Sequence, residues 1–263
     1  LQHDFAFFVS VGGNRMDQRS NTQSQAASQL VMPGVYNISN AAAGTITNAS
    51  YKASKRINSL YAMGELSYKS YAFLDLSARN DWSSALPTNH NSYFYPSASL
   101  SLILSDMFKI EHSALSYAKV RLNWSKVGRD TDPYSLYNSF TFSSPDWGDV
   151  KMATFSTTLK NNNLKPEIAT SYEVGTDLKF FNNRLGIEAT WYTTDSRNQI
   201  IQIPTTMASG YSARIINAGE IRNRGWEVAV HGTPVSGKFI WDIGANFTRN
   251  RNKVIALTDG ITS

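Results

Sequence analysis

The sequence lacks cysteine altogether and is poor in charged side chains. Without cysteine the chain can form no disulfide, no thiolate metal site and no cysteine nucleophile. Charged residues make up 17% of the chain, against about 25% in an ordinary soluble domain. Apolar residues do not fill this gap, because the mean hydropathy is only −0.32. Serine, threonine and asparagine fill it, and aromatic residues reach 12%. This composition indicates β-strands with one apolar face and one polar face.

Long apolar runs are absent as well. The longest is Phe5-Ala6-Phe7-Phe8-Val9, whereas a transmembrane helix needs about 20 apolar residues. The pattern therefore excludes helical spans but not a membrane β-barrel, whose signal is weak in each strand. The chain begins at Leu1 without a signal peptide and ends at Ser263 without a strand pattern. Both ends look cut, so we expect a piece of a larger protein.

A clustered basic surface is the third absence. The net charge is +5 over 25 lysines and arginines, and Lys55-Arg56 is the longest run of adjacent basic side chains. A nucleic-acid site normally appears as a concentrated basic stripe or patch. We therefore expect no nucleic-acid partner.

The strongest positive signal is alternation with a period of two residues. Between residues 71 and 82, apolar side chains such as Leu74 and Leu76 alternate with polar ones such as Asp75 and Arg79. Such alternation predicts strands. Strands of roughly 9–13 residues have the length needed to cross a bilayer at a tilt. About nine segments are predicted, at residues 5–11, 60–68, 71–82, 94–104, 116–125, 171–180, 185–192, 226–231 and 239–248.

The predicted connections alternate between short and long. Short turns are expected at 69–70, 182–183 and 234–237, and long loops at 13–56, 83–92, 127–168 and 196–222. The connection 105–113 is intermediate and is expected to hold a helical turn. Gly12-Gly13 is read as a turn at a strand end. Short turns on one side and long loops on the other are typical of an outer-membrane barrel.

A bilayer assigns the two faces of such strands. Unpaired backbone groups are not tolerated in lipid, so the strands must belong to a closed barrel with its apolar face toward lipid. Aromatic residues near strand ends are expected to form belts at the two interfaces. The alternative for these aromatic side chains is core packing in a soluble β-sandwich. The belt residues predicted are Trp82, Tyr93, Tyr95, Trp124 and Trp226.

Several tracts resemble a known family. One is Arg79-Asn80-Asp81-Trp82-Ser83-Ser84, followed by the tracts 95–101, 105–108 and 115–128. The most specific stretch runs from Leu164 to Leu257 and includes 217–227 and 246–254. In their order and spacing these tracts resemble SusC/RagA-type TonB-linked outer-membrane proteins over nearly the whole chain.

The resemblance implies more than the alternation does. It implies a 22-stranded barrel filled by an N-terminal plug domain, with residues 1–263 forming part of that one barrel domain. It further implies import of oligosaccharides or peptides, energised by TonB–ExbB–ExbD and assisted by a SusD-like surface lipoprotein. The plug, the TonB box and the terminal strands are expected to lie outside this sequence.

No catalytic constellation, metal site or cofactor site is predicted. His3, His90, His112 and His231 have no metal-ligand spacing. Two sets of residues remain as candidates. Polar side chains of two predicted strands can form a charged ladder on the lumen face, either as ion pairs within the wall or in contact with plug or substrate. Three outer-loop aromatics can stack on sugar rings, contact a lid protein or pack within the loop. The ladder comprises Asp75, Arg79, Asp81, Lys119 and Arg121, and the loop set comprises Tyr134, Tyr137 and Trp147.

Three functions follow from these patterns. The first is a barrel-wall portion of a TonB-dependent nutrient importer in the outer membrane. The second is a passive porin-like barrel without energy coupling, which the presence of a plug and TonB box would exclude. The third is a soluble, secreted β-protein that binds carbohydrate, which would fold in water without detergent. About nine strands leave two unpaired edges, so further strands are expected beyond those of this chain.

Overall fold

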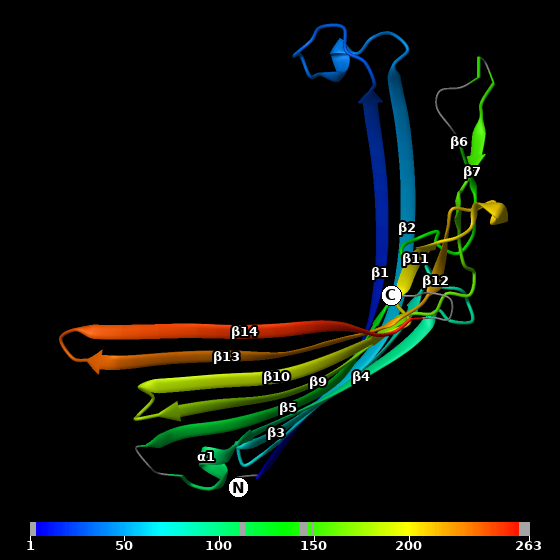
Figure 1. Cartoon of the computed structure of the whole chain (residues 1–263). Coiled ribbons are helices and arrows are strands. Elements are labelled where there is room, and N and C mark those ends of the chain that lie inside the picture. The colour runs from blue at the N-terminus through cyan, green and yellow to red at the C-terminus, as the bar shows by residue number, and fades with distance from the viewer. Residues whose placement is uncertain (1–3, 111–113, 143–146, 149, 258–263) are drawn as a thin grey trace.

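The computed structural model describes residues 4–110, 114–142, 147–148 and 150–257. Its main element is one antiparallel sheet of nine strands in the order β1-β2-β3-β4-β5-β9-β10-β13-β14 (Figure 1). Each strand pairs with the next sheet strand along the chain, so the sheet is an up-and-down meander. The predicted all-β fold with about nine strands is confirmed. The strands are β1 (Phe5–Ala27), β2 (Ile46–Tyr68), β3 (Ala72–Ser83), β4 (Ser92–Ile103), β5 (Leu115–Arg129), β9 (Glu167–Phe180), β10 (Leu185–Arg197), β13 (Glu220–Ser236) and β14 (Ile240–Ala256).

Helical structure is confined to short turns. Helix α1 (Leu104–Met107) lies in the connection where a helical turn is predicted, although residues 111–113 of that connection lie outside the described residues. Two 3-10 turns occupy Ile38–Asn40 and Met207–Ser209. Within the described residues no helix is long and apolar enough to span a bilayer.

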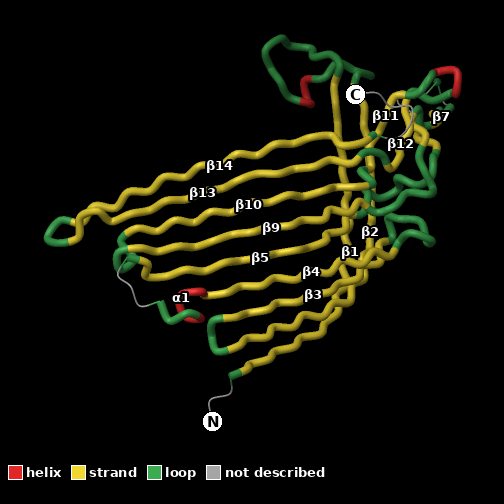
Figure 2. Tube along the Cα trace, turned by 60° about the horizontal axis from the view of Figure 1, so that its bottom comes forward, coloured by secondary structure: helices red, strands yellow, loops and turns green. Residues whose placement is uncertain are grey.

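Short turns and long connections lie at opposite ends of the sheet (Figures 1 and 2). In the turn between β2 and β3, Lys69 and Ser70 both have positive φ, 47° and 58°. This is the primed geometry that matches the twist of two antiparallel strands. The turn at Asn182 and Asn183 also has positive φ. The turn predicted at 234–237 is shifted, because β13 continues to Ser236.

The predicted loop at 13–56 is wrong, because most of it is strand. Strands β1 and β2 have 23 residues each and pair along their whole length, from Phe5↔Tyr68 to Ala27↔Ile46. Strand β3 pairs with β2 only from Ile57 to Tyr68. The parts of β1 and β2 beyond this level form a two-stranded ribbon above the sheet (Figure 1). Most residues on both faces of this ribbon are exposed. Its sequence is therefore mostly polar and lacks the alternation that marks the other strands.

Gly12-Gly13 is not a turn but lies within β1. Gly12 is opposite Tyr61. A Cβ atom at Gly12 would lie 2.5 Å from Cζ of Tyr61. Gly12 makes room for the Tyr61 ring across the strand pair. From the sequence alone, two adjacent glycines predict a turn instead.

The base and the tip of the ribbon are held by polar contacts. At the base, Nε of Arg56 and Nε of Arg15 lie 2.6 Å and 2.9 Å from the carboxylate of Asp17, and these hydrogen bonds lower the pKa of Asp17. At the tip, Nδ2 of Asn40 donates to the carbonyls of Met32 and Val35 at 2.8 Å. The tip is therefore a folded loop rather than a simple turn.

The other outer connections also contain short strands. After β5 the chain forms a hairpin of β6 (Phe140–Phe142) and β7 (Ala153–Phe155). A second small sheet has the order β11-β12-β8, in which β8 (Thr158–Leu159), β11 (Ile200–Pro204) and β12 (Ala213–Asn217) take part. A small hydrophobic cluster of Leu86, Tyr93 and Leu164 anchors these connections to the wall.

The register of the sheet separates two faces. One residue row is apolar over seven neighbouring strands, and the row beside it, one residue along each strand, is mostly polar. Because side chains alternate between faces, the sheet has one apolar and one polar face, as predicted. The apolar row is Leu66, Leu74, Leu100, Leu122, Val174, Trp191 and Trp226. The polar row is Glu65, Asp75, Ser99, Asn123, Glu173, Tyr192, Gly225 and Asn250.

Of the five residues predicted to form an aromatic belt, three lie on the apolar face, and the prediction is wrong for the other two. By register Trp82, Trp124 and Trp226 lie on the apolar face, where a belt toward lipid is expected. Tyr93 and Tyr95 lie on the polar face, because odd positions of β4 alternate with apolar ones such as Leu100. They pack in the cluster under the outer loops, and Tyr93 is 6% exposed.

Two glycines of the last strand pair provide a matched test of packing on the polar face. A Cβ atom at Gly225 would lie 2.6 Å from the carbonyl oxygen of Arg249 and 2.6 Å from the hydroxyl of Tyr192. At Gly244 the nearest atom would be 4.0 Å away. We predict that Gly225→Ala destabilises the full-length barrel by about 1–3 kcal/mol. Gly244→Ala should be neutral or stabilising by up to about 1 kcal/mol. Urea unfolding in detergent, followed by heat-modifiable gel mobility, measures both. Equal effects would contradict the packing described.

Candidate functional site on the polar face of the sheet

The polar face carries a ladder of small hydrogen-bonding side chains. The hydroxyls of Ser77 and Ser97 are 2.7 Å apart across β3 and β4, and those of Ser171 and Thr194 are 2.9 Å apart across β9 and β10. Nδ2 of Asn252 donates to Oδ1 of Asn223 at 2.9 Å. Each pair gives short polar side chains a hydrogen-bond partner on the neighbouring strand. The polar face is therefore a hydrophilic surface.

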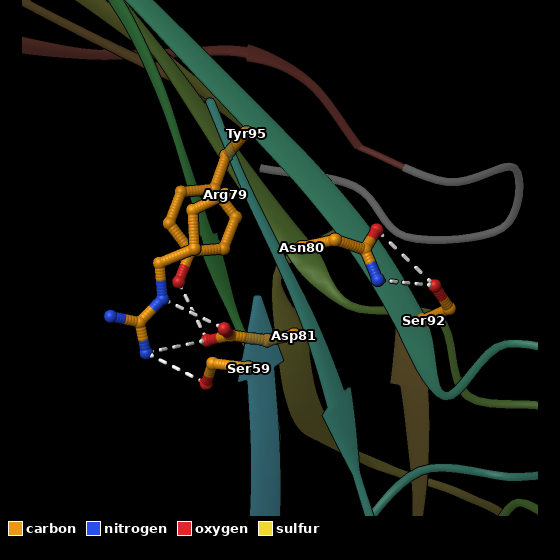
Figure 3. Close-up of polar contacts among 6 residues, drawn as sticks. All are labelled: Ser59, Arg79, Asn80, Asp81, Ser92 and Tyr95. Carbon is orange, nitrogen blue, oxygen red and sulfur yellow. Dashed lines mark hydrogen bonds and ion pairs between the residues drawn. The ribbon is translucent and has the colours of Figure 1, made fainter. Parts of the chain in front are cut away.

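The main charged cluster lies near the outer end of β3 (Figure 3). Nε of Arg79 lies 2.8 Å from Oδ1 of Asp81, and Nη2 of Arg79 donates to Oγ of Ser59 at 2.9 Å. The hydroxyl of Tyr95 donates to Oδ2 of Asp81 at 2.6 Å. The side chain of Asp81 is only 8% exposed, and a buried charge of this kind needs partners. Arg79 supplies a positive charge and Tyr95 supplies a hydroxyl hydrogen bond. This cluster connects β2, β3 and β4.

A second carboxylate connects the outer loops to the same region. Oδ1 of Asp130 lies 3.0 Å from Nζ of Lys55, and Oγ of Ser83 donates to its Oδ2 at 2.5 Å. Asp130 directly follows β5, while Lys55 lies in the ribbon of β2. Both members of the ion pair are largely buried. The base of the ribbon is thus fixed to the segment that leaves β5.

The other predicted ladder residues lie apart from this cluster. Nη2 of Arg121 lies 3.4 Å from Oδ1 of Asp177 in β9, a contact without hydrogen-bond geometry. Within the part of the chain that the structure describes, Lys119 and Asp75 make no side-chain hydrogen bond or ion pair. The structure therefore forms two separate charged groups, one around Asp81 and one around Arg121, instead of a single ladder.

The group around Arg121 contains unsatisfied polar atoms. Among the described residues, Nε of Arg121, Oδ1 of Asp177 and Oγ of Ser101 are buried and have no hydrogen-bond partner. Ser101 is directly opposite Arg121, and the arginine side chain lies over Gly175, where a Cβ atom would be 3.1 Å from Nη2. Such atoms normally have a partner. We call this set the Arg121 patch.

The three loop aromatics are in different environments. Tyr134 is tied down, because its hydroxyl lies 3.3 Å from Oγ of Ser54 and its carbonyl accepts from Nζ of Lys160. Tyr137 and Trp147 are 67% and 77% exposed. No ring contact joins any two of the three in the described chain. Two of them therefore present free aromatic faces at the outer end.

Ligand chemistry based on metals has no support in the described residues. No group of three or more His, Cys, Asp or Glu side chains lies close enough there to hold a metal ion. His231 lies over Gly186, and His90 lies in the connection between β3 and β4. His3 and His112 lie outside the described residues.

Sequence reasoning missed several partners of the predicted residues. Ser59, Tyr95 and Asp177 complete the two charged groups, yet they come from neighbouring strands whose register is not known beforehand. Asp130 was missed because it lies in a segment read as loop. The period-two pattern gives the face of each residue but not its neighbour across the sheet.

Nine antiparallel strands with one apolar and one polar face, short turns at one end and long connections at the other define a piece of an outer-membrane β-barrel wall. Comparison with known families agrees. The family described as TonB dependent receptor-like, beta-barrel matches residues 1–262. The chain belongs to this family and so to an outer-membrane protein.

Individual relatives are similar over most of the chain. TonB-dependent receptor P3 of Formosa agariphila is 26% identical over 256 residues, which cover 95% of this chain and 26% of the relative. The TonB-dependent receptor SusC of Bacteroides thetaiotaomicron is 28% identical over 193 residues, covering 69% of this chain and 19% of SusC. The predicted resemblance to SusC/RagA-type proteins is confirmed.

Solved structures share the fold. The structure of the RagAB peptide transporter superimposes with a TM-score of 0.84 at 20% sequence identity, covering 99% of this chain and 29% of the matched chain. The chain thus spans between a fifth and a third of the length of these relatives. All of them are named as receptors or transporters and none as an enzyme.

The Asp81 cluster generates a stability prediction. We predict that Asp81→Asn destabilises the full-length barrel by about 1–3 kcal/mol, because a buried charged acceptor of Arg79 is lost. Adding Arg79→Met should cost less than the sum of the two single changes, with a coupling of about 0.5–3 kcal/mol. Unfolding in urea would measure the complete cycle.

Asn80→Ala is the matched control. Asn80 is on the same strand but on the opposite face, where Nδ2 donates to Oγ of Ser92 at 3.0 Å (Figure 3). Its loss should change stability by less than about 0.5 kcal/mol. Additive effects of the Arg79 and Asp81 changes would show that the pair is energetically unimportant.

Proposed function

We propose that residues 1–263 form part of the wall of a TonB-dependent importer of nutrients such as oligosaccharides or peptides. The observation that carries this proposal is the nine-strand meander with a lipid-type face on one side and an ordered polar face on the other. The family to which the chain belongs supports the TonB-dependent part. The SusC and RagAB relatives support the class of cargo, since one of them is named as a peptide transporter.

The polar face suits a lumen that holds another protein segment. The Arg121 patch has three buried polar atoms without a hydrogen-bond partner among the described residues. Buried orphan groups of this kind each cost about 1–3 kcal/mol. We propose that a plug domain or ordered water supplies their partners in the full-length protein. The plug and the TonB box are assigned to parts of the protein outside these residues.

The same proposal implies two kinds of protein partner. Energy is proposed to come from TonB–ExbB–ExbD through the plug, and a SusD-like surface lipoprotein is proposed to cover the outer end. The wall itself takes part in no covalent chemistry in this proposal and needs no cofactor. Its roles are to seal the path against lipid and to present loop residues to cargo and lid.

Transport by intact cells tests the proposal. The full-length gene is expressed in a Gram-negative host that lacks its own importer, with and without TonB, and uptake of labelled oligosaccharides and peptides is measured. Uptake should require both the importer and TonB and should stop when a protonophore is added. Uptake that persists without TonB would favour a passive porin instead.

Conductance gives an independent comparison of the two mechanisms. A plugged importer should show little steady current in a planar bilayer, whereas a porin shows a stable open-channel current. If the full-length protein is recovered folded from the soluble fraction without detergent, both membrane hypotheses are wrong.

The free loop aromatics generate a prediction for cargo or lid binding. Tyr137→Ala with Trp147→Ala should weaken binding by about tenfold or more, because a stacked aromatic face is worth roughly 1 kcal/mol or more. Isothermal titration of cargo and of purified lid protein would separate the two roles. Phe181→Ala, at an exposed position in a turn at the opposite end of the sheet, is the control and should change neither. Unchanged binding of both partners in the double variant would remove these residues from the site.

A further inference from the structure

The apolar face contains a groove near the end of the sheet that carries the short turns (Figure 1). Its volume is about 420 Å³, and Leu185, Val230 and Ile243 line it with apolar side chains. Val230 lies in β13 with Trp226, at an even number of positions from it, and side chains spaced in this way share a face. The groove therefore opens toward the lipid and not toward the lumen.

Small residues between bulky ones create this groove. Gly232 is paired with Leu185 on one side and with Ile243 on the other, and Ala245 is opposite Val230. A Cβ atom at Gly232 would be 3.5 Å from the nearest atom, so the space is not filled by a neighbouring side chain. The pairing of β13 with β14 also shifts register directly after Gly232, as at a β-bulge. The groove is thus a consequence of residue size and of an interrupted strand pair.

The depth of the groove in the bilayer follows from the aromatic residues on the same face. Gly232 is about 20 Å from Trp226 along β13, and the hydrocarbon core is about 30 Å thick. Trp241 shares the apolar face with Ile243 and is 52% exposed, as expected for a second aromatic belt at the other interface. Short turns of outer-membrane barrels are on the periplasmic side. The groove is therefore level with the acyl chains of the inner leaflet.

One cation, Arg184, lines the groove. Its Nε donates to the carbonyl of Thr233 at 3.3 Å and its Nη2 to that of Pro234 at 2.8 Å, which holds the guanidinium against the interrupted part of β13. These two bonds leave most of its N–H donors available. Asp242 accepts a hydrogen bond from the hydroxyl of Thr233, but no ion pair among the described residues includes Arg184. The positive charge is therefore available to an anion at the edge of the inner leaflet.

An apolar ring continues the groove toward the turn. Phe181 lines the groove, is 56% exposed and has positive φ in the turn between β9 and β10. The site thus combines an apolar channel, an exposed ring and one unpaired guanidinium in a single recess. A ligand that fits it has a long apolar chain attached to an anionic group.

We infer that this groove binds one phospholipid molecule of the inner leaflet, with an acyl chain in the groove and the phosphate on Arg184. Guanidinium groups bind phosphate oxygens in a bidentate manner. The apolar walls remove the acyl chain from contact with the mobile lipids around the barrel and hold it in one place. Because the groove opens on the lipid side, the phospholipid enters it from the bilayer without passing through the lumen. The site is therefore independent of whether the lumen serves an importer or a passive porin.

The test measures phospholipid binding by the purified, delipidated full-length protein. Native mass spectrometry follows titration with phosphatidylglycerol and with a diacylglycerol that has the same acyl chains but no phosphate. The wild type should bind one molecule of phosphatidylglycerol about tenfold more tightly than the diacylglycerol. Arg184→Gln should lose this preference, whereas Arg184→Lys, which retains the charge, should keep most of it.

A second variant tests the groove itself. In Ala245→Phe the added ring should occupy the space of the acyl chain, so the affinity for phosphatidylglycerol should fall about tenfold or more. Ala62→Phe is the matched control, because Ala62 is exposed on the same face in β2 but lies outside the groove. Lys69→Gln is the control for charge, because Lys69 is at the same end of the sheet but is already 3.7 Å from Asp4. Both controls should bind like the wild type.

Heat-modifiable gel mobility confirms that each variant is folded. Equal affinity of the wild type for both lipids, or unchanged binding in Ala245→Phe, would overturn the inference. A retained preference in Arg184→Gln would do the same. So would an equal loss in either control, or full competition by millimolar inorganic phosphate, which would indicate a site for free anions.

Discussion

The hydrogen-bonding requirement of the backbone governs this chain more than any side-chain contact does. In hydrocarbon each unpaired N–H or C=O costs several kcal/mol, and no water is present to satisfy it. The continuous antiparallel register from β1 to β14 meets this requirement within the sheet, except along the outer edges of β1 and β14, which have no partner strand among the described residues. Once the ladder exists, alternation assigns every side chain to lipid or to lumen. The composition is poor in charge but rich in small polar and aromatic residues, because each strand has one face toward lipid and the other toward the lumen.

The polar and apolar faces carry different kinds of information. The apolar face is repetitive, because its rows consist mainly of leucine, valine and tryptophan, which suit contact with lipid in any barrel. The polar face is specific, because Ser59, Arg79, Asp81 and Tyr95 meet across three strands and the Arg121 patch is left incomplete. Family membership is therefore recognised from the order of the sequence tracts along the strands and not from a cluster of catalytic residues.

Most of the wall could be predicted from the sequence, since alternation around residues such as Leu74 and Asp75 reports directly on two solvents. The ribbon could not be predicted, because residues 17–27 have water on both sides and no periodic constraint. The partners of Asp81 and Arg121 depend on register, which a single strand does not encode. Tyr93 and Tyr95 were misplaced for another reason. Aromatic residues near strand ends occur both in lipid belts and in packed lumen clusters, and only their parity relative to Leu100 separates the two.

The ribbon has a mechanical consequence. Beyond the level at which β3 joins β2, about ten residues in each strand rise freely, which at about 3.3 Å per residue gives a height of roughly 35 Å. That height exceeds the thickness of the hydrocarbon core. Among the described residues, the side-chain contacts that join the ribbon to the outer loops lie near its base, at Lys55–Asp130 and Ser54–Tyr134. Because the ribbon is long and its contacts lie at its base, a small rotation there would displace the Asn40 loop by a much larger distance than it displaces the residues of β3.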